Sequence, residues 1–209
     1  MTWRGRFGNW FLRKFPVSRF VVDLVRVEVG SCILSAGNRL LPWRRRKLKR
    51  LIHQKGLRLN VACGPHVLPG FVNIDLRASR RDVVALDCRR RVPFTGDSIA
   101  GIRAEHFFEH LEPREEVPAF LAECRRALSS GGVLRVIVPD AERFLRAYCR
   151  DDLTGFLELA VPIPFPEDLP TRMEVVNHTF HQWHEHRRGY DFETLAHRLR
   201  FPASRMSRR

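Results

Sequence analysis

Short apolar segments alternate with turns and helical patterns from residue 57 onward, and this alternation constrains the fold more than any other feature. We expect strands near Leu57–Ala62, Phe71–Ile74, Asp82–Leu86, Ile99–Ala104 and Val133–Val138. Strands that alternate with helices predict an α/β fold with a mostly parallel sheet. Such sheets bind ligands beyond the carboxyl ends of their strands, so the residues that follow each strand are the candidates for function.

Helices are expected where apolar residues recur three and four positions apart. The segments are Arg114–Ser129, Ala141–Cys149 and Asp191–Leu199, with Asp191 as the N-cap of the last, and the less regular Val17–Leu41. The run Ser129–Gly132 is expected to end its helix through a left-handed glycine. Only the eight residues Cys63–Gly70 join the first two strands, where a parallel crossover needs about a dozen. Either this crossover is shortened, or the two strands are not direct neighbours.

Charge divides the 209-residue chain into three parts. The formal charge is +11 over residues 1–50, −2 over residues 51–195 and +5 over residues 196–209. We therefore expect a basic, aromatic helical extension (1–50, with Pro42–Arg50 as a linker), a central domain (51–200, with a lid at 151–190) and a basic tail (201–209). Basic ends suit a tether to an anionic surface, or they are simply solvated tails.

Aromatic and cationic residues interleave between Trp3 and Phe15, which suits a helix in a membrane interface or one packed on the central domain. No uncharged stretch of the N-terminal region reaches the ~18 apolar residues of a membrane span. Five widely spaced cysteines without a CxxC motif argue for a reducing compartment. We expect a cytoplasmic protein, with or without attachment to the inner face of the membrane.

Five stretches form a recognisable series: LNVACGPHVLPGFVNID (59–75), DCRRRVPFTGDSI (87–99), EHFFEHL (105–111), ALSSGGVLRVIVPD (127–140) and GYDFETLAHRL (189–199). With this series the chain resembles the class I S-adenosylmethionine-dependent methyltransferases, in particular a bacterial branch found with polysaccharide and natural-product pathways. The resemblance implies a Rossmann-like, doubly wound sheet. The family's C-terminal strand hairpin has no counterpart in the sequence after residue 200. This leaves three alternatives: a truncated sheet, an edge covered by a second chain, or a damaged gene whose protein is not fully competent.

The resemblance also implies a role for each residue at the strand ends. Those matched to cofactor binding are Ala62, Cys63, Gly64, Asp75, Leu76, Asp87, Cys88 and Glu105. Asp75 would accept hydrogen bonds from both ribose hydroxyls, for which a carboxylate is well suited. Asp87 would meet the adenine amino group, and the backbone at Gly64 would lie against the methionine part. For each acid the alternative is a helix cap or a surface charge.

Methyl transfer to a hydroxyl needs a general base, and a histidine is the natural one at neutral pH. His106 follows the fourth strand and is one candidate; His181 and His184, in the histidine-rich stretch Asn177–His186, are the others. That stretch matches no zinc spacing, so no metal is expected. His110 is interpreted as a helix-surface residue.

The function expected from these residues is methyl transfer from S-adenosylmethionine to oxygen of a small-molecule or glycan acceptor. The motif that marks methylation of base amino groups is missing after the fourth strand, which argues against a nucleic-acid substrate. The rival interpretation is an inactive, truncated module that binds a membrane or nucleic acid through its basic ends.

Overall fold

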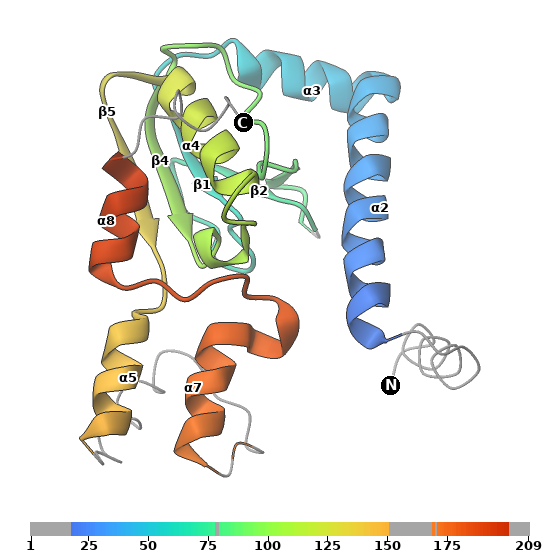
Figure 1. The fold of residues 1–209 in the computed structure, drawn as a ribbon. Helices are drawn as coiled ribbons and strands as arrows, with labels where there is room; N and C mark the ends of the chain where they lie inside the picture. The colour runs from blue at the N-terminus through green and yellow to red at the C-terminus, as the bar shows by residue number, and fades with distance from the viewer. Residues whose placement is uncertain (1–17, 78–79, 151–168, 170, 201–209) are drawn as a thin grey trace.

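The computed structural model describes residues 18–77, 80–150, 169 and 171–200 (Figure 1). Its centre is a five-stranded sheet in the order β3-β2-β1-β4-β5, with every neighbouring pair parallel. The strands are β1 (Leu57–Val61), β2 (Val72–Asp75), β3 (Val83–Ala85), β4 (Ile99–Glu105) and β5 (Leu128–Ile137). The predicted α/β class is confirmed, and the sheet is compatible with a Rossmann-like fold. Winding reverses between β1 and β4, where such sheets place their ligands.

The connection between β1 and β2 is a shortened crossover without a helix, because the two strands pair directly. Two buried asparagines hold it in place. The Asn60 side chain donates to the Asn73 side chain (2.9 Å) and to the His66 carbonyl (2.8 Å). Asn73 also accepts from the Leu68 backbone N–H (2.9 Å) and donates to the Leu68 carbonyl (3.1 Å). These side chains pair with backbone N–H and carbonyl groups of the loop, which would bond to one another if the crossover were a helix.

Helix α4 (Glu116–Ala127) packs on the sheet but ends two residues before the predicted Ser129. The glycine pair does not end this helix. Instead β5 begins at Leu128, which pairs with Ile99, and the register shifts before Val133 pairs with Gly101. Gly131 has φ +76° within this irregular stretch. The left-handed glycine was therefore predicted correctly, but it serves a bulge in β5 and not a helix terminus.

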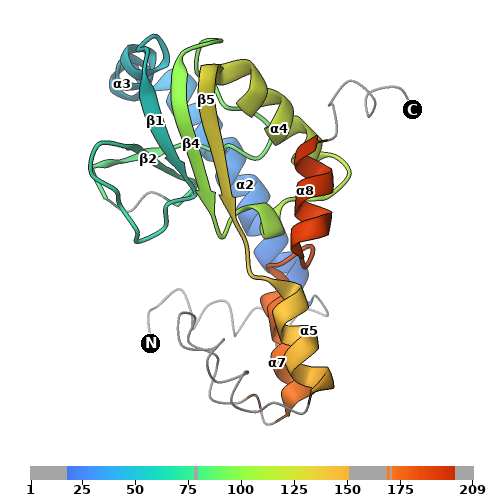
Figure 2. The same ribbon diagram turned by 90° about the vertical axis from the view of Figure 1, so that its left-hand side faces the viewer.

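Helices α4 and α8 (Phe192–Arg200) lie on the same side of the sheet in both views (Figures 1 and 2). Asp191 caps α8 as predicted, accepting from the Thr194 N–H at 2.7 Å. Helices α5 (Ala141–Cys149) and α7 (Arg172–His181) form a pair beyond the carboxyl ends of the strands (Figure 1). This pair continues the molecule past the edge where the site residues lie.

The segment Pro42–Arg50, predicted to be a linker, is a helix, and that prediction was wrong. Helix α3 (Pro42–Ile52) follows α2 (Arg19–Leu40) almost without a break. Proline is favoured at the first helical position, and Arg, Lys and Leu are good helix formers, so charge density alone did not identify a linker. None of the helices in the described part of the chain is long and apolar enough to cross a membrane.

Among the described residues, no strand pairs with the outer edge of β5. The expectations for residues 1–15 and 201–209, and for residues 151–168 and 170 of the lid, concern residues outside the described ranges.

Candidate functional site

The loop after β1 has an unusual backbone. Ala62 and Gly64 both have left-handed angles, with φ of +54° and +49°. Between them, the Cys63 N–H donates to the Ile74 carbonyl of β2 at 3.0 Å. A Cβ placed on Gly64 would meet nothing within 4 Å, so open space lies in front of this residue. The turn therefore presents bare backbone at the edge where winding reverses.

Asp75 ends β2 beside this turn. One oxygen of its carboxylate accepts from the Gly64 N–H (2.9 Å) and the other from the Arg77 N–H (2.7 Å). A carboxylate has about four acceptor positions, so two backbone bonds leave capacity for more donors. Leu76 follows and is half-buried. The structure thus joins Gly64 and Asp75, as the predicted cofactor site requires.

Asp87 is placed differently, because three neighbouring groups already donate to it. Both carboxylate oxygens accept from the Arg89 guanidinium (2.7–3.1 Å). One also accepts from the Ser31 hydroxyl of α2 at 2.5 Å, and the other from the Arg89 backbone N–H at 2.9 Å. Burial alone would raise the pKa of Asp87, but the hydrogen bonds from Arg89 and Ser31 outweigh it and lower the pKa. In this arrangement Asp87 anchors α2, and its acceptor positions are in use.

The two cysteines predicted near the cofactor are buried thiols. Burial and the nearby Asp75 carboxylate raise the pKa of Cys63. Burial and the neighbouring Asp87 raise the pKa of Cys88 to about 12. Because the thiolate is the nucleophile, neither side chain is suited to covalent catalysis.

The exit of β4 carries an acid and a histidine. Glu105 forms an ion pair with Arg103 of the same strand. His106 has a left-handed φ of +49°, and its side chain is 46% exposed. Its Nδ1 lies 3.1 Å from Oε1 of Glu109. This hydrogen bond raises the pKa of His106 against the opposing effect of burial.

A cluster that the sequence analysis did not identify surrounds Glu109. One carboxylate oxygen of Glu109 and one ring nitrogen each of His110 and His186 all lie within 4.8 Å of one another. The two histidine rings meet edge to face at 4.9 Å. His110 is therefore not a helix-surface residue; it lies on a 3-10 turn (η1, Phe108–His110) and contacts the segment after α7.

The histidine-rich stretch contributes to this cluster through a different residue from those predicted. His181 ends α7 and His184 lies in the following 3-10 turn (η2, Gln182–His184), and both are exposed. It is His186, half-buried, that reaches the exit of β4. The density of histidines in this stretch was a usable signal for a functional site. The pairing of His186 with Glu109 and His110, however, depends on tertiary structure.

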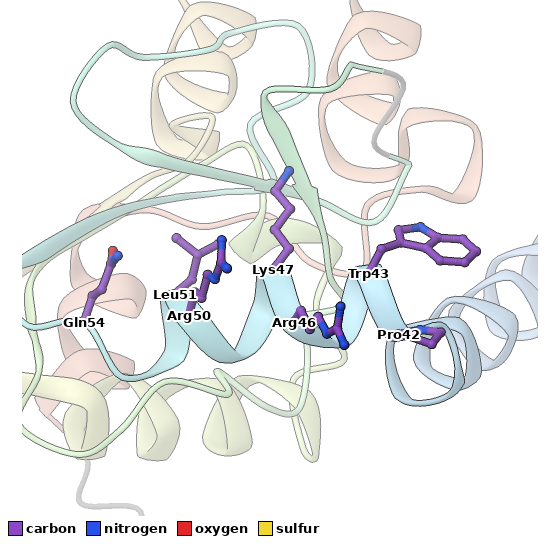
Figure 3. Close-up of a pocket in the computed structure, with 7 residues that line it drawn as sticks. All are labelled: Pro42, Trp43, Arg46, Lys47, Arg50, Leu51 and Gln54. Atoms are coloured by element: carbon purple, nitrogen blue, oxygen red, sulfur yellow. The ribbon is translucent and has the colours of Figure 1, made fainter.

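A pocket lies elsewhere, on α3 (Figure 3). It has a volume of about 620 Å³ and is lined by Trp43, Leu51 and several polar or basic residues of the same helix. Because α3 leads into β1, this cavity is at the opposite end of the sheet from the strand exits (Figure 1).

Comparison of the chain with protein-family models, with curated proteins and with solved structures found no match in any of the three.

Proposed function

We propose that the protein is an S-adenosylmethionine-dependent methyltransferase that acts on a hydroxyl of a small-molecule or glycan acceptor. The observation that carries this proposal is the contact between the turn after β1 and the carboxylate that ends β2, at the edge where the winding of the sheet reverses. Gly64 presents its backbone there, and Asp75 is hydrogen-bonded to the Gly64 N–H. The resemblance to class I methyltransferases supplies the chemical identity of the ligand.

The residues of this edge fit such a cofactor in part. The open space before Gly64 leaves room for the methionine part, and Asp75 retains acceptor capacity for ribose hydroxyls. Asp87 fits less well, because Arg89 and Ser31 already use its oxygens. When bound, the cofactor would supply a methyl group on a positively charged sulfur, which is electrophilic without further activation.

The chain's own task would be to orient the acceptor and take up its proton. Glu109 Oε1 accepts a hydrogen bond from Nδ1–H of His106, which leaves Nε2 to accept a proton. A carboxylate behind an imidazole fixes the tautomer and stabilises the imidazolium, as in hydrolase triads. We assign His106 as the base and Glu109 as its positioning residue.

Calorimetric titration with S-adenosylmethionine and its demethylated product tests the cofactor site. Wild type should bind with micromolar affinity. Asp75→Asn keeps the shape but removes the charge, so affinity should fall about 10-fold or more, the cost of weakened charge-assisted hydrogen bonds. Asp82→Asn is the matched control, since Asp82 is an exposed acid paired with Arg80 before β3.

A folded wild type that binds neither compound would overturn the enzyme proposal. Binding without turnover of any acceptor, at the affinity expected above, would favour the rival interpretation of an inactive module.

A second candidate function, attachment to an anionic membrane, rests on the outer surface of α2 and α3. Large apolar side chains of α2 are exposed: Val21, Leu24, Val25, Val29, Ile33 and Leu40. Residues that contact the domain, Ser31, Leu34 and Asn38, lie on the side of the helix opposite Val25, Val29, Ile33 and Leu40. Helix α3 adds an exposed Trp43 and six exposed cations. Apolar and basic residues together suit a lipid surface.

A further inference from the structure

We propose that Glu109, His110 and His186 form a binding site for a divalent transition metal, with zinc as the best-fitting ion. This inference does not depend on the proposed methyl transfer. Two imidazoles and one carboxylate are a donor set that holds zinc in enzymes, with a fourth position left for another ligand. The three donor atoms lie within 4.8 Å of one another. Around a tetrahedral ion with bonds of about 2.0–2.1 Å they would be roughly 3.3 Å apart, so a pair at the 4.8 Å limit would have to close by about 1.5 Å.

The carboxylate of Glu109 provides the first supporting observation. The residue is 1% exposed, and Oε1 is occupied by His106. Its Oε2 is buried and has no hydrogen-bond partner in the described structure. A buried carboxyl oxygen without a hydrogen-bond partner is costly. A bound cation would remove that cost.

The two histidines provide the second observation, because a backbone carbonyl fixes one nitrogen of each ring. Nδ1 of His110 lies 3.0 Å from the Glu185 carbonyl, and Nδ1 of His186 lies 2.8 Å from the Thr179 carbonyl. A carbonyl oxygen only accepts, so each Nδ1 must carry the proton. In the neutral ring Nε2 then carries the lone pair, which is the tautomer a metal requires. Histidine ligands typically have their other nitrogen fixed in this way.

The backbone holds the two donor segments together without a metal. Glu109 and His110 lie on the turn after β4, whereas His186 comes much later in the chain. The N–H groups of Arg187 and Arg188 donate to the Glu109 carbonyl at 2.8 and 3.3 Å. A metal would therefore bind a largely preformed site and fasten the segment after α7 beside His106.

Zinc itself is the probe, added to metal-free full-length protein in which the exposed Cys32 and Cys149 are replaced by serine. We expect one tightly bound equivalent by calorimetry and a higher Tm in its presence. Cobalt in place of zinc should give the visible absorption of a tetrahedral nitrogen and oxygen site.

The variants are His186→Asn, His110→Asn and Glu109→Gln. Each asparagine retains a donor near the position of Nδ1, so the carbonyl contact survives while the ligand nitrogen is lost. Affinity should fall at least about 100-fold in each variant. The matched control, His53→Asn, changes an exposed histidine after α3 and should leave affinity unchanged.

No zinc binding by the folded background protein would overturn the site. Equal binding by the three site variants and the control would also overturn it, because the metal would then be bound by surface histidines. If one variant fails to fold in the absence of metal, the other two decide the question.

Discussion

Ala62 adopts a conformation that L-residues avoid. Its φ of +54° costs roughly 1–2 kcal/mol for a residue with a Cβ, whereas glycine adopts it readily. We therefore expect Ala62→Gly to stabilise the protein by about 0.5–1 kcal/mol, after allowing for the greater freedom of glycine in the unfolded chain. Urea denaturation measures this. Ala119→Gly, in the ordinary helix α4, should instead destabilise by about 1 kcal/mol. Loss of stability in both variants would contradict the claim that the backbone at Ala62 is strained.

His106 is expected to titrate above the ordinary histidine value, because its hydrogen bond to Glu109 favours the protonated ring. A histidine with a raised folded-state pKa adds stability below its unfolded pKa and loses it as the pH rises through the folded pKa. NMR titration of metal-free protein should show the raised pKa, and Glu109→Gln should lower it. An unchanged His106 titration in that variant would remove Glu109 as its positioning residue.

Most elements of the sheet could be predicted because their signals are local. The runs at β1, β4 and β5 are apolar and bounded by turn residues, and α5 was predicted with its bounds unchanged. The Asp75 position follows from the strand–turn–strand pattern alone. Helix α3 was missed because its dense charge resembled a linker. Glu109 and His186 were missed as partners because no local pattern links residues so far apart in the chain.

Arg89 links α2 and α4 to the loop after β3. It forms ion pairs with Asp87 (2.7 Å), with Glu28 of α2 (2.5 Å) and with Glu116 of α4 (3.4 Å). Arg89→Met should destabilise the protein by about 2–4 kcal/mol, since it leaves partly buried acids without their cation. Arg90→Met is the control: this side chain is largely exposed, and the change should cost less than about 1 kcal/mol. Equal effects in urea denaturation would show that α2 is held by other contacts.

At the scale of the whole molecule, exposed apolar side chains of α2 and exposed cations of α3 lie on two consecutive helices. Ile33 of α2 is 67% and Trp43 of α3 66% exposed, and α3 carries six exposed cations. Each cation near an anionic membrane contributes about 1 kcal/mol, and added salt screens this attraction. The protein should therefore sediment with phosphatidylglycerol vesicles at low salt and much less with phosphatidylcholine vesicles.

The double variant Val25→Ser/Ile33→Ser tests whether α2 itself contacts lipid. Both side chains point away from the domain, so stability should change by no more than about 0.5 kcal/mol. Vesicle affinity should fall about 10-fold, the expected effect of losing two partly inserted aliphatic side chains. Val133→Ser is the matched control, because Val133 is 63% exposed on β5, far from α2.

Loss of binding only when the cations of α3 are neutralised would mean that charge, without insertion of α2, holds the protein at the membrane. Undiminished binding at low salt by every variant, including one with the cations of α3 neutralised, would contradict the membrane surface altogether.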